Sequence, residues 1–252
     1  MHKNACNILL TISYDGTNYG GWQKQPNSIT IQEKLETALS RVFNKSISVL
    51  GASRTDAGVH ALGQKACFFT DNLLIPIDKL PFVINSFLPR DITITSASIA
   101  PIDFHPRFDA LKKTYLYHIY NNSFPNPLLR NYAWHVRYPL DVSVMKTAAE
   151  HFLGKHDFSA FCSANGNAKT FTRSIFDIEV FTNSPSVFIS VTGDGFLYNM
   201  VRIITGTLMY VGIGKTKPCA IPFIIEEKER ALAGITAPAN GLTLMDIKYK
   251  KM

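Results

Sequence analysis

The stretch Ile8-Leu-Leu-Thr-Ile-Ser-Tyr14 begins the pattern that decides the fold, because its apolar residues alternate as in a strand with one buried face. A glycine-rich loop follows it. Thr30-Ile-Gln-Glu33 then has the spacing of a capping box, which predicts the start of a helix. Apolar residues recur at helical spacing behind this box, so we expect a helix over residues 31–43.

The rest of the first half continues outward from this helix as strand, strand, helix and strand. The segments expected to form these elements are residues 46–50, 65–70, 78–88 with Asp78 as a possible helix cap, and 92–99. A loop over residues 51–63 joins the second strand to the third. The complete order is that of a split βαβ, or ferredoxin-like, unit.

The second half repeats this order loosely. Its first strand, residues 114–120, is rich in β-forming residues and places Tyr115, Tyr117 and Ile119 on one face. The other expected elements are a helix capped by Asp141, strands at 175–181 and 187–192, helices at 196–211 and 222–233 with Gly234 as a C-cap, and a strand at 242–248. We therefore predict an α+β fold of two ferredoxin-like halves with antiparallel sheets, residues 1–105 and 106–252.

Length and composition are those of a folded globular protein. The chain has 252 residues, 46% of them apolar, and a formal net charge of +7. Residues 1–105 carry 9 basic and 8 acidic side chains, and residues 106–252 carry 17 and 11, so the net charges are +1 and +6. This composition excludes intrinsic disorder. The uneven basic excess indicates a polyanionic partner, nucleic acid or a membrane surface, with an ordinary basic protein as the alternative.

Cysteine usage and hydropathy predict a cytoplasmic protein. The four cysteines form no Cys-x-x-Cys pair, so we expect neither a disulfide framework nor a zinc ribbon. The apolar run at residues 8–12 is followed at once by Tyr14 and Asp15, which argues against a signal peptide. The weakly charged stretch 196–213 contains Arg202 and predicts a buried helix, not a membrane span.

The loop Gly51-Ala-Ser-Arg-Thr-Asp-Ala-Gly-Val-His60 is the most informative segment for chemistry. Arg54 and Asp56 are two residues apart, so their side chains can point the same way in extended backbone. A nearby arginine lowers the pKa of an aspartate and keeps it ionised. An ionised carboxylate can act as a nucleophile, a general base or a metal ligand. The alternative is that the pair only fixes the loop.

Two further residues are candidates for substrate binding. Tyr115 follows Lys112 and Lys113 on a strand, an arrangement suited to base stacking and phosphate contact, although strand tyrosines are usually core residues. Arg202 is the only charge within residues 196–213. It therefore either pairs with a carboxylate or a ligand anion, or extends its guanidinium to water.

No motif for a metal or a cofactor is present in the sequence, and we expect neither. Gly214-Lys-Thr216 lacks the upstream glycine of a phosphate-binding loop, and Pro218-Cys219 lacks the second cysteine of a zinc deaminase. His151 and His156 are five residues apart, which does not place them on one helical face.

Several blocks of the sequence, in addition to the loop 51–60, resemble the TruA-type tRNA pseudouridine synthases. They are Tyr14-Asp-Gly-Thr-Asn-Tyr-Gly-Gly-Trp-Gln-Lys-Gln25 with Thr30-Ile-Gln-Glu33, Asp103-Phe-His-Pro-Arg-Phe108 with Lys113-Thr-Tyr-Leu-Tyr117, Asn199-Met-Val-Arg-Ile-Ile-Thr-Gly-Thr-Leu208, and Ala237-Pro-Ala-Asn-Gly-Leu-Thr-Leu244. These blocks span almost the whole chain in the family's order, so together they are highly specific.

The resemblance implies an isomerase that converts uridine to pseudouridine at positions 38, 39 and 40 of the tRNA anticodon stem-loop, without a metal or a cofactor. By position, Asp56 is the catalytic nucleophile and Tyr115 packs on the uracil. Arg54 and Arg202 match active-site basic residues, and Arg202 is expected to pair with Asp56. The resemblance also implies that the two halves meet at a central active-site cleft, and that a homodimer binds the tRNA across both subunits.

Two other classes of function are open to the residues alone. A ferredoxin-like sheet can bind RNA without catalysis, but the aromatic signature of an RNA-recognition motif is missing from the sequence. A hydrolase or phosphotransferase can use an aspartyl nucleophile, but such enzymes normally need magnesium, and no run of carboxylates surrounds Asp56 in the sequence. Neither class explains the distant blocks.

Overall fold

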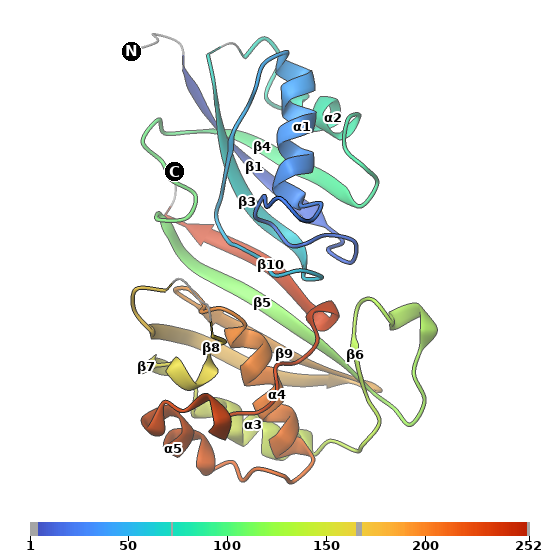
Figure 1. Ribbon diagram of the computed structural model, residues 1–252, viewed down its shortest axis with the longest axis vertical. Coiled ribbons are helices and arrows are strands. Elements are labelled where there is room, and N and C mark those ends of the chain that lie inside the picture. The colour runs from blue at the N-terminus through green and yellow to red at the C-terminus, as the bar shows by residue number, and fades with distance from the viewer. Residues whose placement is uncertain (1–4, 72, 165–167, 251–252) are drawn as a thin grey trace. The chain divides into compact units, whose positions relative to one another are not determined.

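The structure, a computed structural model, describes residues 5–71, 73–164 and 168–250. The chain divides into two compact units, Met1–Leu111 with Leu244–Met252, and Lys112–Thr243 (Figure 1). These units differ from the predicted division at residues 105 and 106, because the C-terminal residues belong to the first unit. No helix in the described ranges is long and apolar enough to cross a membrane.

The first unit has the predicted order of strands and helices. Its elements are β1 (Cys6–Tyr14), α1 (Ile31–Phe43), β2 (Val49–Gly51), β3 (His60–Thr70), α2 (Leu80–Asn85), β4 (Ile92–Ala100) and the end of β10 (Leu242–Tyr249). The strand β1 lies between β3 and β4 and pairs antiparallel with both, and β2 pairs antiparallel with β3. The unit is therefore an α+β structure with an antiparallel sheet, as predicted.

The alternation that opened the sequence places one face of β1 in the core. Ile8, Leu10 and Ile12 are all 0% exposed. They share this core with buried residues of α1, which include Leu35 and Leu39. Burial of several aliphatic side chains of this size contributes about 1.5–3 kcal/mol each relative to exposure.

The C-terminal segment returns to the first unit through contacts of Tyr249. Its ring lies edge-on to Phe104, with centroids 4.9 Å apart, and its hydroxyl donates to Pro106 O at 2.8 Å. These contacts explain why the last strand does not belong wholly to the second half, where the sequence had placed it.

The second unit is also α+β. Its elements are the main part of β5 (Ala110–Asn121), β6 (Trp134–Val136), α3 (Val142–Glu150), β7 (Gly154–Asp157), β8 (Thr172–Asn183), β9 (Ser186–Gly193), α4 (Met200–Gly212), α5 (Ala220–Glu227) and four short 3-10 turns, η1 (Pro127–Leu129), η2 (Ser159–Phe161), η3 (Arg230–Leu232) and η4 (Ala239–Gly241). Strands follow the order β5-β9-β8-β7 with antiparallel pairing, and β6 pairs parallel with β5. Figure 1 shows α3, α4 and α5 gathered on one side of these strands.

Two helices are shorter than the sequence predicts, for local reasons. Of the helix expected over 78–88, only Leu80–Asn85 (α2) is helical. Its N-cap is Lys79, which makes no side-chain capping bond, so Asp78 is not the cap. Pro89 disfavours helical backbone at the residue before it, which limits the helix on the C-terminal side. The helix expected from residue 196 begins at Met200, because Asn199 has a left-handed backbone with φ of 61°.

The helix expected over 222–233 is also displaced. The helix α5 ends at Glu227, and Lys228 is its C-cap with φ of 60°, so Gly234 is not the C-cap. Gly234 instead packs on α4, where its N–H donates to Thr207 Oγ1 at 2.8 Å. A Cβ at Gly234 would lie 2.4 Å from Thr207 N, so glycine is required by this close approach. The strands β6 and β7 have three and four residues, too few for a period-two pattern to be recognised.

Candidate active site

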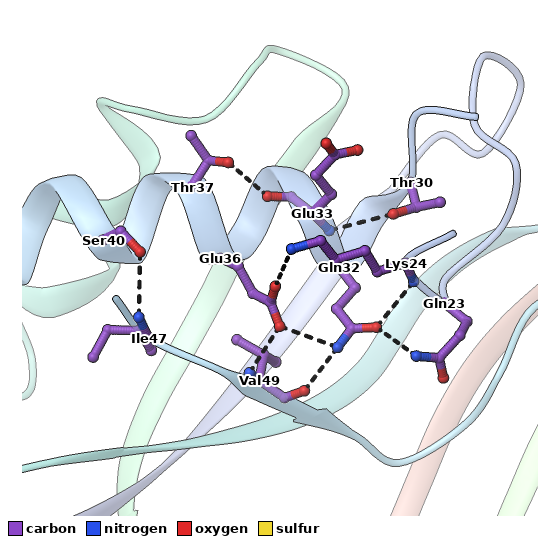
Figure 2. Close-up of polar contacts among 10 residues, drawn as sticks. All are labelled: Gln23, Lys24, Thr30, Gln32, Glu33, Glu36, Thr37, Ser40, Ile47 and Val49. Carbon is purple, nitrogen blue, oxygen red and sulfur yellow. Dashed lines mark hydrogen bonds and ion pairs between the residues drawn. The ribbon is translucent and has the colours of Figure 1, made fainter. Parts of the chain in front are cut away.

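The strand that leads into the Asp56 loop is held by two side chains of α1 (Figure 2). The N–H of Val49 donates to Glu36 Oε1 at 3.1 Å, and Gln32 Nε2 donates to Val49 O at 3.0 Å. Gln32 Oε1 also accepts the N–H of Lys24 at 3.1 Å. Side chains of α1 thus bind the N–H and the carbonyl of Val49, and Gln32 connects Val49 to Lys24 in the loop that follows β1.

The first part of the loop is bound by the buried side chain of Gln64, on β3. Gln64 is 0% exposed. Its Nε2 donates to Ser53 O at 2.7 Å, and its Oε1 accepts the N–H of Ser53 at 3.2 Å. The Gln64 amide therefore pairs with both backbone groups of Ser53, as a neighbouring strand would. The preceding residue still pairs with a strand, because the N–H of Ala52 donates to Lys65 O at 2.8 Å. The loop leaves the strand along a fixed path.

Thr55, the residue before Asp56, is fixed through both its side chain and its backbone. Thr55 Oγ1 lies 2.7 Å from the hydroxyl of Tyr14, and Thr55 O accepts the N–H of Trp22 at 3.0 Å. Gln64 Nε2 donates to the same Tyr14 hydroxyl at 3.5 Å. Three side chains, Gln64, Tyr14 and Thr55, therefore form a buried chain that ends next to Asp56.

Asp56 itself starts a tight turn. Its carbonyl accepts the N–H of Val59 at 3.1 Å, and Gly58 has φ of 78°, a conformation that favours glycine. The N–H of Gly58 donates to Tyr19 O at 3.3 Å. The Asp56 side chain is half-buried. With residue 55 fixed on one side and the turn on the other, the backbone gives the carboxylate a defined direction.

The glycine-rich loop that follows β1 approaches this turn closely at Gly21. Its φ is +93°, and a Cβ added there would lie 2.5 Å from Thr55 O and 3.0 Å from Asp56 C. Gly21 therefore allows two segments, distant in sequence, to meet directly behind the carboxylate. This explains in physical terms why the glycine-rich stretch and the Asp56 loop occur together.

Arg54 lies on the same loop and is exposed, whereas Asp56 is half-buried. The contacts described above bind the loop through Tyr14, Gln64 and Trp22. The planar guanidinium of an exposed arginine suits contact with an anionic ligand.

Arg202, on the first turn of α4 in the second unit, is half-buried and held by two strong contacts. Its Nε donates to Ala237 O and its Nη1 donates to Asn199 Oδ1, both at 2.7 Å. The N–H of Ala237 donates in return to Arg202 O at 3.1 Å. The left-handed conformation of Asn199 places its amide beside the guanidinium, so the direction of Arg202 is set before any ligand binds.

The positive charge of Arg202 acts on Tyr117, which lies on β5 two residues after Tyr115. Burial raises the pKa of Tyr117, and the charge of Arg202 opposes this rise. The Tyr117 hydroxyl donates to Pro238 O at 2.7 Å, next to the Ala237 that binds Arg202. Arg202, Tyr117 and the segment 237–238 thus form one cluster in the second unit.

Tyr115 is buried, 6% exposed, with its ring edge-on to Phe196 at 5.3 Å. The predicted face of β5 is confirmed, because Tyr117 and Ile119 are 0% exposed. Lys113 falls on the same inward face and is only 9% exposed. The expectation that Lys113 joins an exposed phosphate-binding surface is therefore wrong, whereas Lys112 is exposed as expected.

Sequence reasoning missed several residues that fix these candidates. Gln64, Thr55 and Asn199 act through backbone groups or loop geometry, which residue spacing does not encode. In the sequence, Tyr14 ends a strand and begins a block that resembles the family, and neither position indicates its bond to Thr55. One usable signal was present, since a glutamine within a buried strand needs hydrogen-bond partners for its amide.

Comparison with known proteins gives a consistent result. The chain matches the tRNA pseudouridine synthase family over residues 10–109 and 148–250. It is 51% identical over 243 residues to tRNA pseudouridine synthase A of Caldicellulosiruptor bescii, which covers 96% of this chain and 99% of that protein. The protein of the same name from Acetivibrio thermocellus is 50% identical over 243 residues, with 96% and 99% covered. A tRNA pseudouridine synthase A 2 from Clostridium tetani is 46% identical over 247 residues, with 97% and 99% covered.

Proposed function

This chain belongs to the tRNA pseudouridine synthase family, and from that membership we propose that it isomerises uridine to pseudouridine at positions 38, 39 and 40 of the tRNA anticodon stem-loop. The observation that carries the proposal is the turn at Asp56, which follows Thr55, bound by Tyr14 and Trp22, and is closed by the N–H of Val59. Catalytic groups gain most from such prior positioning.

We assign Asp56 as the nucleophile. It attacks either C1′ of the ribose or C6 of the uracil, and the N1–C1′ bond breaks. The base then turns, C5 bonds to C1′, and the bond between Asp56 and the substrate breaks, which returns the carboxylate. The proton on C5 is lost, and N1 gains a proton. The reaction is an isomerisation with no net oxidation or hydrolysis, so its atoms and electrons balance within the substrate.

The remaining site residues keep the roles that the family resemblance implies. Tyr115 packs on the uracil, and Arg54 and Arg202 are the cationic residues of the active site. The target uridine must leave its stack at a cost of a few kcal/mol, and contact with an aromatic ring offsets part of that cost. The fixed direction of Arg202, held by Ala237 and Asn199, supports its assignment.

We propose tRNA as the partner, bound through its anticodon arm by a homodimer. The net charge of +7 supports binding to a polyanion. The free cysteines, among them buried Cys67 and Cys162, suit a reducing compartment and support a cytoplasmic location.

The direct test is to incubate the protein with an unmodified tRNA transcript and to map pseudouridine by chemical labelling. The proposal predicts label at one or more of positions 38, 39 and 40. An RNA that is bound but not modified would indicate a binding module without catalysis. Label confined to other positions would contradict the assigned target.

A further inference from the structure

A cavity of about 460 Å³ lies within the second unit, between the loop that follows β5 and the turn η4. This volume is within the range of small-ligand sites. Its lining includes Tyr120, Arg130, Trp134, His135 and Asn240.

Hydrogen bonds fix the walls of this cavity. Asn240 Nδ2 donates to Arg130 O at 2.8 Å and to Ala133 O at 2.9 Å, which ties η4 to the loop. Asn126 Oδ1 accepts the N–H of Leu128 at 3.0 Å at the start of η1. A His135 ring nitrogen lies 2.8 Å from Asn122 O. The cavity is therefore formed without a ligand, which lowers the cost of binding.

The chemistry around the cavity suits a nucleotide. Tyr120 and Trp134 supply aromatic rings, and Arg130 supplies an exposed cation of which one N–H is used by Pro127 O at 2.9 Å. Arg130 is the one lysine or arginine among the described residues that line the cavity, and none of them is an aspartate or a glutamate. Aromatic rings beside a cation are typical of single-stranded nucleic-acid sites.

The cavity also lies close to the substrate tyrosine along β5. Trp134 is paired with Ile119 and its ring lies edge-on to Tyr117, with centroids 6.3 Å apart. Tyr117 is two residues from Tyr115, and two strand residues span roughly 7 Å. Trp134 is paired with Ile119, four residues from Tyr115, so the two positions lie roughly 13 Å apart along β5. This distance corresponds to a few nucleotides of a single strand.

We propose that this cavity binds a second base of the substrate RNA, on a nucleotide a few positions from the target uridine. Its base contacts Trp134 and its phosphate meets Arg130. The identity of the RNA rests on the proposed function, but the binding requires no catalysis.

The test measures binding of three anticodon-arm RNAs to the full chain. One RNA is intact, and the other two lack the bases a few positions from the target uridine, on its 5′ or its 3′ side. The proteins are the unaltered chain, Trp134→Ala, Trp134→Phe, and Phe223→Ala as the control. Phe223 is an aromatic residue on α5 that is 54% exposed in the same unit and does not line the cavity.

Trp134→Ala should weaken binding of the intact RNA about tenfold, the low end of what one base–aromatic contact contributes. One of the two abasic RNAs should show little further loss with this variant, because the base that Trp134 contacts is already absent. Trp134→Phe should recover most of the affinity, and Phe223→Ala should bind like the unaltered chain. The defect of Trp134→Ala in modification should appear as a raised KM, which Trp134→Phe should largely restore.

Arg130→Ala provides a second measurement that does not disturb a packed ring. It should reduce the slope of log affinity against log salt by about one. An equal loss for all three RNAs in Trp134→Ala, or no loss at all, would overturn the proposal. A further outcome is that neither the unaltered chain nor any variant forms pseudouridine, while Trp134→Ala still shows little further loss of binding with one abasic RNA. That result would contradict the proposed function and support the proposed base site.

Discussion

The hydroxyl of Tyr14 lies 2.7 Å from Oγ1 of Thr55, so the end of the first strand is bonded directly to the residue that precedes Asp56. Tyr14 is 4% exposed and Thr55 is 6% exposed, so this contact is shielded from water. It joins the strand core to the backbone of the proposed nucleophile. The position of the carboxylate therefore depends on one oxygen atom that is remote in sequence.

Tyr14→Phe removes only that oxygen. We expect kcat to fall about tenfold or more, because small displacements of a catalytic group are costly, while KM for tRNA changes little. The loss of one buried hydrogen bond should lower the free energy of unfolding by about 1 kcal/mol. Single-turnover rates on a tRNA transcript, with unfolding followed in urea, would measure both effects.

The control for this variant is Tyr249→Phe, which removes a hydroxyl bonded to Pro106 O in the same unit. It should lose comparable stability and keep its rate. Thr55→Ser, which retains a hydroxyl, should stay close to the unaltered rate, and Thr55→Val should not. Equal rates for Thr55→Ser and Thr55→Val would show that the bond does not position Asp56.

Gln64→Glu preserves shape but removes the donor that binds Ser53 O at 2.7 Å. A carboxylate at this fully buried position is costly, so its pKa in the folded state should rise. A raised pKa means that stability is retained below the unfolded pKa, about 4.3, and is lost as pH rises through the folded pKa. The stability deficit relative to the unaltered chain should therefore be larger at pH 8 than at pH 5.

Urea unfolding at the two pH values measures this difference. The control is Gln23→Glu, which changes an exposed side chain and should show no such dependence. A deficit of the same size at both pH values would mean that the new carboxylate is not buried against Ser53.

Arg202→Lys keeps the charge but loses the two-atom geometry that binds Ala237 O and Asn199 Oδ1. A lysine cannot make both contacts from one planar group. We expect the modification rate to fall about tenfold or more. Arg173→Lys is the control, because Arg173 also donates to backbone carbonyls in the second unit, at Thr170 O and Thr172 O. Similar losses in both variants would argue against a special role for Arg202.

Alkaline pH should destabilise the fold. Burial raises the pKa of the Cys67 thiol to about 12 from an ordinary value of 9.0. Because the folded state holds the proton more tightly, this contribution to stability is complete below pH 9 and is lost as pH rises towards 12. Burial also raises the pKa of Tyr117 and of Tyr249, in the same direction.

The measurement is the free energy of unfolding in urea at pH 8 and at pH 10.5. It should fall between these values, and Cys67→Val should fall less. A free energy that does not change over this range would contradict the burial of these groups.

Local signals in the sequence predict the elements well where a side chain acts on its own segment. Thr30 accepts the N–H of Glu33 at 3.4 Å, as the capping box requires, and Asp141 accepts two N–H groups at the start of α3. The inward face of β5 is confirmed by burial. In β1 the predicted face is buried, but Asn7 and Leu9 on the opposite face are buried too, so the strand does not have one buried face alone. These features depend on neighbours within one turn or one strand, so their spacing is visible in the sequence.

Features that depend on tertiary contact were not predictable in the same way. Gly234 has the sequence context of a helix C-cap, yet it is required by contact with α4, and Lys228 ends the helix instead. The charge of Lys113 suggests that it lies on the surface, but its position in the alternation of β5 turns it to the interior. The Gln64–Tyr14–Thr55 chain joins three segments, and no local pattern indicates that they meet.

We assign the Asp56 carboxylate, in a loop held by Tyr14 and Gln64, as the nucleophile that converts uridine to pseudouridine in tRNA. The most direct measurement is the single-turnover rate of pseudouridine formation by Asp56→Asn on an anticodon-arm transcript, together with the affinity for the same RNA. We predict that the rate falls at least about a thousandfold while the affinity stays within a few-fold. A variant that retains a near-normal rate would contradict the assignment of Asp56.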